Sequence, residues 1–194
     1  MPYRRGSYIT ESARFKVIEK SARLARVLST GSVSVKLRDD QEMIDIEALK
    51  RAALKQFKLS QHSIHGLSHW ERVHSHGLAI CQAEPTVDHV VVECFAYLHD
   101  CQRHSDGRDP QHGPRAATYC SSIRRTLLQD LSDKQFKDLV LAITHHTDGK
   151  TTQNLTVGAC WDADRLDLTR CGVRPSPSFL STPTGRRLAK ENRD

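Results

Sequence analysis

Five segments between residues 67 and 171 carry apolar side chains at the spacing of an α-helix, and each places a His or an Asp near one end. We expect helices over residues 67–83, 86–100, 112–129, 132–146 and 159–171. Because no stretch shows the strong alternation of a half-buried strand, the predicted fold class is all-α. Antiparallel helices and their loops can bring such ends to one rim of a bundle, so the pattern allows a single His/Asp cluster.

The rest of the chain is expected to form two further helices, two loops and a C-terminal tail. Residues 11–28 and 44–58 also have apolar side chains at helical spacing, which predicts two further helices. Residues 101–111 and 147–158 are rich in Gly and polar residues, and we expect both segments to be loops. The proline-rich tail after residue 171 is expected to cross the surface and to end in a short helical turn.

Composition places the chain among ordinary soluble domains. Its 194 residues are 38% hydrophobic and 27% charged, which suits one domain with a sizeable core. No run of apolar residues is long enough for a transmembrane helix, and the first residues lack the apolar stretch of a secretory signal. The six Cys include no C-x-x-C pair and read as reduced thiols, so we expect a cytoplasmic protein without membrane contact.

The positive charge of the chain is concentrated at its beginning. The formal net charge is +6, and residues 1–40 contribute nine Lys or Arg against four Asp or Glu, a net of +5. We therefore divide the chain into a basic N-terminal extension, residues 1–40, and a helical domain, residues 41–194. The extension is either an arm that binds nucleic acid or another polyanion, or a solvated leader; composition leaves both interpretations open.

Imidazoles and carboxylates dominate the polar helix ends. Such ligands suit Mn, Fe, Ni, Co or Zn, and one or two divalent ions are expected. Asp100 is the natural bridging ligand, because a carboxylate has two oxygens and can hold two ions. Two ions roughly 3.5–4 Å apart can clamp a phosphoryl group and activate a water molecule near neutral pH. The candidate ligands in chain order are His69, His99, Asp100, His112, His145, His146 and Asp164.

Three short motifs connect these residues to a known family. "HWERV" (69–73), "YLHD" (97–100) and "DADRLD" (162–167) resemble, in this order, the motifs of the HD-domain superfamily of metal-dependent phosphohydrolases. The resemblance covers residues 65–170 and implies an HD-type helical bundle. It also implies a first metal site made of His69, His99, Asp100 and Asp164.

Part of that superfamily holds a second ion, and this chain resembles that subset as well. "HGPRAA", which begins at residue 112, and "HHTDG", which begins at residue 145, are similar to the additional motifs. The resemblance implies a second site made of Asp100, His112, His145 and His146. An adjacent His pair at a helix end has another interpretation, because one of its members can interact with the last carbonyl groups of the helix.

The resemblance also implies a mechanism in which the metal lowers the pKa of a bound water, whose hydroxide attacks phosphorus. Positive side chains would stabilise the added negative charge or face the substrate. Asp162 is expected to support a neighbouring ligand or to cap a helix, and Asp148 to assist proton transfer. The candidates for contact with substrate or phosphate are Arg103, Arg165, Lys150 and His104.

The substrate is the least constrained part of the prediction. A small phosphorylated compound, most simply a nucleotide, fits a domain of this size. Three alternatives remain: a nuclease acting on single-stranded nucleic acid, a diiron oxygenase of the HD fold, and a catalytically silent nucleotide-binding regulator. His65 and His69 have the spacing of the H-E-x-x-H zinc proteases, but Gly66 stands where their Glu belongs, which argues against that class. Nothing in the sequence indicates an oligomeric state.

Overall fold

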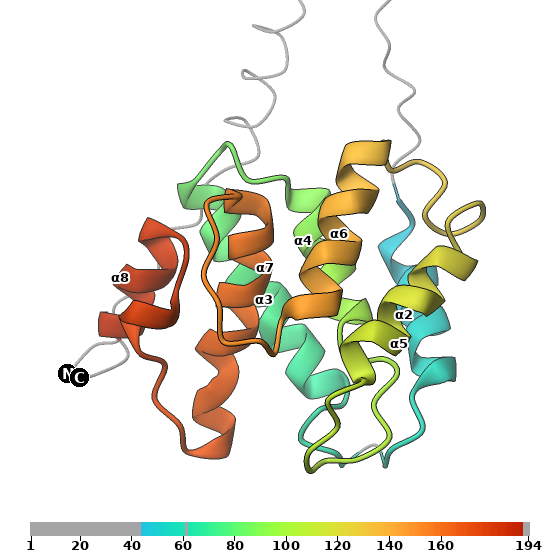
Figure 1. Cartoon of the computed structure of the whole chain (residues 1–194), viewed down its shortest axis with the longest axis horizontal. Helices are drawn as coiled ribbons and strands as arrows, with labels where there is room; N and C mark the ends of the chain where they lie inside the picture. Colours follow the sequence, from blue (N-terminus) through green and yellow to red (C-terminus); the bar gives the residue numbers. More distant parts are fainter. Residues whose placement is uncertain (1–43, 61, 192–194) are drawn as a thin grey trace, which may run out of the picture. The chain divides into compact units, whose positions relative to one another are not determined.

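The described part of the chain, residues 44–60 and 62–191 of a computed structural model, consists of helices and turns and contains no β-strand (Figure 1). The all-α prediction is therefore confirmed for these residues. The predicted helix over 11–28 and the basic extension 1–40 lie outside the described residues, so that domain boundary stays a prediction. The α-helices are α2 (Ile46–Gln56), α3 (Leu67–Ala83), α4 (His89–Leu98), α5 (His112–Ser122), α6 (Asp133–His145), α7 (Leu155–Leu166) and α8 (Pro183–Glu191), and the 3-10 helices are η1 (Asp167–Cys171) and η2 (Pro177–Phe179).

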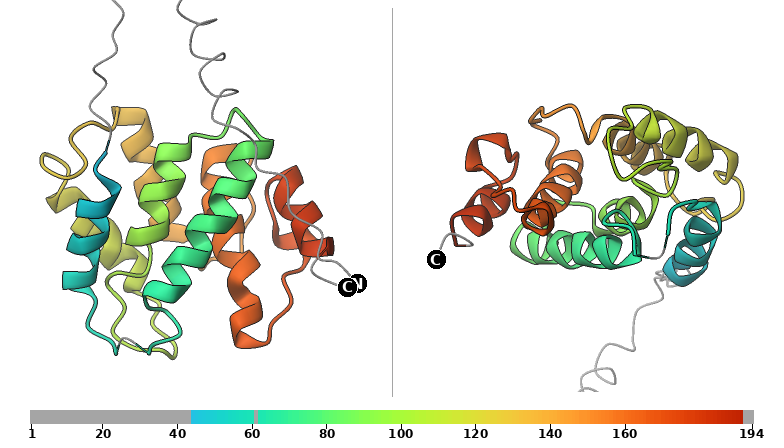
Figure 2. Two further views of the ribbon diagram at one scale, coloured as in Figure 1. Left: turned by 180° about the vertical axis from the view of Figure 1, so that it is seen from behind. Right: turned by 90° about the horizontal axis from the view of Figure 1, so that it is seen from below.

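Helix α4 is the centre of the bundle. It packs against α2, α3, α6 and α7, and the left view of Figure 2 shows it between α2 and α3. Its sequence, HVVVECFAYL, is apolar on nearly every face, and Phe95 and Leu98 are fully buried. A helix that is hydrophobic all round is stable only inside a core, which explains this position. The polar residues that follow α4 are therefore delivered into the interior.

Short polar side chains set where the helices begin. Asp45, Asp88 and Asn154 each accept hydrogen bonds from backbone N–H groups in the first turns of α2, α4 and α7. Ser132 forms a reciprocal capping box with Gln135 at the start of α6. These caps satisfy N–H groups that have no partner within the helix, so the sequence specifies the helix starts locally.

Several predicted boundaries differ from the structure. Helix α7 begins at Leu155, within the segment predicted as loop, because the Asn154 side chain accepts from the N–H groups of Thr156 and Val157. Helix α5 ends at Ser122 instead of continuing to residue 129, and turns follow it. Helix α4 ends at Leu98, so that His99 and Asp100 lie in the turn just after it.

The C-terminal segment also differs from its prediction, because it ends in the nine-residue helix α8 and not in a single turn. Buried Asp162 on α7 accepts hydrogen bonds from the backbone N–H groups of Ser181 and Thr182 and from the Thr182 hydroxyl. A Cβ atom on Gly185 would stand 2.4 Å from Asp162 Oδ2, so only glycine allows this close approach of α8 to α7. Asp162 thus anchors the C-terminal segment to the bundle.

Within the described residues, none of the helices has both the length and the apolar character needed to cross a membrane.

Candidate metal centre

Three helices bring a first group of possible ligands together. His69 lies in the first turn of α3, His99 directly follows α4, and Asp164 lies near the end of α7. The Nε2 atoms of His69 and His99 are 3.1 Å apart, and Asp164 Oδ1 lies 3.4 Å from the first and 3.8 Å from the second. Both imidazoles are fully buried. One nitrogen from each ring and one carboxylate oxygen therefore face a common point.

A second group lies beside the first and shares Asp100 with it. His112 opens α5 and His146 directly follows α6; their Nε2 atoms are 2.8 Å apart. Asp100 Oδ1 lies 3.1 Å from His112 Nε2 and 3.6 Å from His146 Nε2. The other oxygen, Oδ2, lies 3.7 Å from the Nε2 atoms of both His69 and His99. Asp100 thus presents one oxygen to each group, which is the arrangement of a bridging ligand.

The opposite ring nitrogens of these histidines are held by acceptors. His69 Nδ1 lies 2.7 Å from Asp167 Oδ2. His99 Nδ1 donates to the carbonyl oxygen of Ala96 at 3.1 Å, and His146 Nδ1 donates to that of Ile143 at 2.8 Å. An imidazole that donates from Nδ1 and is neutral has a lone pair on Nε2. Metal-binding histidines are commonly oriented by such a hydrogen bond.

This geometry fits a cation. With Nδ1 protonated, the two pairs of facing Nε2 atoms have no proton between them, so each pair is repulsive unless a positive charge lies nearby. Asp100 Oδ1 is buried and forms no hydrogen bond of acceptable geometry, although His112 is close to it. A buried carboxylate oxygen without a partner is unfavourable. A divalent ion in each group would satisfy both the imidazole lone pairs and this oxygen.

The electrostatics of the cluster agree with this interpretation. Burial lowers the pKa of His99 to about 3, so this ring is neutral near pH 7. Burial opposes ionisation of Asp100, but His99 and the hydrogen-bonding imidazoles around it hold its pKa well below the usual range. Desolvation likewise opposes ionisation of the half-buried Asp164, but its hydrogen bond to His69 keeps its pKa low. The site therefore combines the neutral imidazole of His99 with two ionised carboxylates.

Two other cluster histidines have the opposite tendency. Burial lowers the pKa of His69, but hydrogen bonds to Asp164 and Asp167 raise it above its ordinary value. Burial also opposes protonation of His146, whose pKa is nevertheless raised by the nearby carboxylate of Asp100. Protons and metal ions would therefore compete for these rings, since each can balance the negative charge of the carboxylates.

His65 is a member of the cluster that sequence reasoning missed. It precedes α3, and its Nδ1 atom lies 2.9 Å from Asp100 Oδ2 and 3.4 Å from a guanidinium nitrogen of Arg170. His65, His69 and Asp100 form a third group of possible ligand atoms. The four-residue spacing to His69 was a visible signal, but it was considered only for a zinc protease, which Gly66 argues against; His65 lies in a turn before the helix begins.

His145 does not join the cluster, in contrast to its neighbour His146. Its ring lies on the exposed side of the chain, where Nδ1 is 3.0 Å from Asp148 Oδ2. Lys150 contacts the same carboxylate at 3.1 Å. Asp148 thus contacts the His145 ring and the Lys150 ammonium group at the surface and belongs to none of the three ligand groups. Asp162 anchors the C-terminal segment, so its predicted helix-cap or ligand-supporting function is not what the structure displays.

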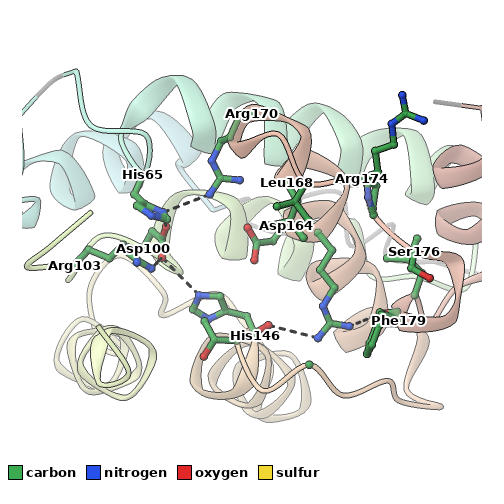
Figure 3. A pocket seen from close by; sticks show the side chains of 16 residues that line it. His65, Asp100, Arg103, His146, Asp164, Leu168, Arg170, Arg174, Ser176 and Phe179 are labelled. Atoms are coloured by element: carbon green, nitrogen blue, oxygen red, sulfur yellow. Dashed lines mark hydrogen bonds and ion pairs between the residues drawn. The ribbon is translucent and has the colours of Figure 1, made fainter. Parts of the chain in front are cut away.

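A cavity of about 440 Å³ opens beside the cluster (Figure 3). Asp100, His146 and Asp164 contribute to its wall, as do Arg103 and Arg165. Lys150 and His104, two other candidates for substrate contact, do not line it. The cavity gives a small ligand access to the candidate metal ligands.

The two buried arginines of the cavity are extensively hydrogen-bonded to the chain itself. Arg103 donates to the carbonyl oxygens of Ser105 and Gly107, and its Nη1 atom lies 3.5 Å from Asp100 Oδ1. Arg165 donates to the carbonyl oxygens of Lys150 and Phe179, each at 2.6 Å. Both guanidinium groups therefore carry positive charge into the cavity while they hold its loops in place.

Comparison with known proteins finds one relevant likeness. The structure is similar to the crystal structure of a predicted HD superfamily hydrolase from an uncultured Thermotogales bacterium, with a TM-score of 0.63 and 25% sequence identity. The match covers 78% of this chain and 87% of that chain. No protein-family model and no curated protein matches the sequence.

Proposed function

We propose that this chain is a metal-dependent phosphohydrolase of the HD superfamily, because its structure is similar to that of a predicted HD superfamily hydrolase and brings together three groups of possible metal ligands. The proposed reaction is the hydrolysis of a phosphoester or phosphoanhydride bond in a small phosphorylated compound, and we take a nucleotide as its substrate. The observation that carries the proposal is the division of Asp100 between two ligand groups, with one oxygen facing each.

A pair of ligand groups joined by one carboxylate is suited to phosphoryl chemistry. A divalent ion bound in each group would lower the pKa of water and balance negative charge on the phosphoryl oxygens. The ligand set contains imidazoles and carboxylates without thiolate, which favours Mn, Fe, Ni, Co or Zn. The buried Cys94 and Cys101 are not part of the three groups, so no thiolate ligand influences which metal ion binds.

The cavity supplies the remaining requirements. Arg103 and Arg165 place positive charge beside Asp100 and Asp164, where a phosphate group would be attracted and its added charge stabilised. Arg170 also lines the cavity and is held by the Ile64 and Asp167 carbonyl oxygens. A fixed set of guanidinium groups around the ligand cluster favours a substrate with several anionic oxygens.

The proposal is tested by measuring phosphate release from a panel of nucleotides with Mn²⁺, Fe²⁺, Co²⁺, Ni²⁺ or Zn²⁺. We expect release by the wild-type protein, and we expect Asp100→Ala to abolish it and to lower the bound metal. Asp133→Ala is the matched control, because its side chain is 93% exposed and lies on the surface of α6. This variant should behave as wild type.

Three results would contradict the proposal, each in favour of another function. Two bound irons with oxygen uptake and no phosphate release would indicate an oxygenase. Cleavage of single-stranded DNA or RNA without action on nucleotides, weakened by salt, would indicate a nuclease. Nucleotide binding without turnover with any of these metals would indicate a regulator.

A further inference from the structure

The wall of the cavity opposite the ligand cluster is apolar and comes from a single stretch of chain. Leu168 in η1, Val173, Pro175, Phe179 in η2 and Leu180 all line the cavity. Figure 3 shows Phe179, Ser176 and Arg174 at one end and His65, Asp100 and Arg103 at the other, with Asp164 between them. The cavity therefore has a metal-ligand end and a second end, where Phe179 lies together with Arg174 and Ser176.

Folding does not account for the exposure of this wall. Phe179 is 55% exposed and Val173 is 51% exposed, although both are large apolar side chains. Within residues 44–60 and 62–191, five large hydrophobic side chains are exposed, and these two both line the same cavity. Single exposed apolar residues are ordinary, but a pair gathered in a concave site is typical of a surface that receives an apolar part of a ligand.

The wall is held rigidly. The Phe179 carbonyl oxygen accepts from Arg165 at 2.6 Å, and the adjacent Leu180 is 1% exposed. Directly after it, the N–H groups of Ser181 and Thr182 donate to the buried carboxylate of Asp162 at 2.8 and 2.7 Å. The Phe179 backbone is thus held at its own carbonyl group and directly after it, so a ligand that binds to the ring needs little further ordering of the backbone.

We infer that Phe179, which lines the same cavity as Val173, forms a subsite that stacks on the planar ring of the substrate, while the phosphate lies at the metal-ligand end. This inference rests on the proposed phosphohydrolase function and adds which part of the substrate the protein recognises. A phosphate group alone would leave the apolar wall empty, whereas about 440 Å³ is in the range of sites that enclose a small organic ligand. An aromatic side chain can stack on any nucleobase, because every nucleobase has a flat π-face.

The test compares substrates that share the scissile group and differ only in the ring. Adenosine 5′-monophosphate and ribose 5-phosphate form one such pair, and both are assayed for phosphate release with Mn²⁺. We expect Phe179→Ala to lower kcat/KM for the nucleotide by roughly 10- to 100-fold and that for ribose 5-phosphate by less than about twofold. Phe179→Trp keeps a flat ring and should retain the preference for the nucleotide.

Leu141→Ala is the matched control, since Leu141 is 44% exposed on α6 and does not line the cavity. It should leave both substrates unchanged. Equal loss for both substrates in Phe179→Ala, or no loss for either, would overturn the ring subsite and leave the phosphohydrolase function intact.

Equilibrium binding of the same two compounds tests the ring subsite separately from the phosphohydrolase function, because binding does not require turnover. If no phosphate is released but adenosine 5′-monophosphate binds more tightly than ribose 5-phosphate in a Phe179-dependent manner, the ring subsite stands and the hydrolase function fails. Equal affinity for both compounds in the wild-type protein would overturn the subsite.

Discussion

Replacing His146 by Ala should remove one metal ion, whereas the same change at the adjacent His145 should remove none. The two residues follow each other in "HHTDG", yet only His146 reaches the cluster, where its Nε2 atom is 2.8 Å from that of His112 and 3.6 Å from Asp100 Oδ1. The His145 side chain is 42% exposed and contacts Asp148. The pair is therefore an internal control with identical chemistry.

The size of the effect follows from the number of ligands lost. The second group offers three protein atoms, so His146→Ala removes one third of the protein ligands of that ion. Changing a group that only orients a ligand typically costs 10- to 100-fold in metal affinity, and loss of a ligand itself should cost at least about 100-fold. This corresponds to about 3 kcal/mol. For His145→Ala we expect a change of less than about twofold, because a largely exposed ion pair contributes little.

Metal content by mass spectrometry and Mn²⁺ titration by calorimetry measure these changes. Because His146 is only 4% exposed, its replacement by Ala also leaves a small cavity, and circular dichroism should verify that the variant is folded. His146→Gln, which fills more of that space, provides a second variant. If His146→Ala and His146→Gln both fold and retain the wild-type metal count, the assignment of the second group is refuted.

Three further changes test other parts of the structure. Gly113→Ala should lower the affinity for the second ion more than for the first, because its Cβ would lie 2.7 Å from the Ile143 carbonyl oxygen and force α5 away from the end of α6. An equal loss of affinity at both sites in a Mn²⁺ titration would contradict this. Asp162→Ala should lower the free energy of unfolding in urea by about 2–4 kcal/mol, because three buried donors of the C-terminal segment lose their acceptor, and a loss below about 1 kcal/mol would argue against the anchor. Alkylation of the native protein at pH 8 should label exposed Cys171 and spare Cys94, because burial raises the pKa of the Cys94 thiol to about 12 and leaves almost no thiolate; peptide mass spectrometry showing equal labelling would contradict this.

The helical framework was readable from the sequence because its signals are local. The apolar period predicted α3 with the same first and last residues, and Ser132 marked the start of α6. Where a boundary was misplaced, a competing local signal decided it: Asn154 capped α7 earlier than the apolar period indicated. The residue types also indicated the chemistry, because His and Asp recur at the helix ends that follow or precede apolar runs.

The identity of the residues that meet at the centre required the tertiary structure. Successive residues of a helix are rotated by about 100°, so His145 and His146 cannot both face the cluster, and only the packing of α6 against its neighbours selects His146. His65 lies in a turn, where no periodicity predicts which way a side chain points. In the sequence, Phe179 lies in a proline-rich tail that carries no functional motif. It lines the cavity because Asp162 and Arg165 hold that tail against α7. The sequence thus determined the helices and the kinds of ligand they carry, since these depend on near neighbours in the chain. The tertiary structure alone decided which ligands converge and what lies opposite them, since those contacts join residues as much as about 100 positions apart.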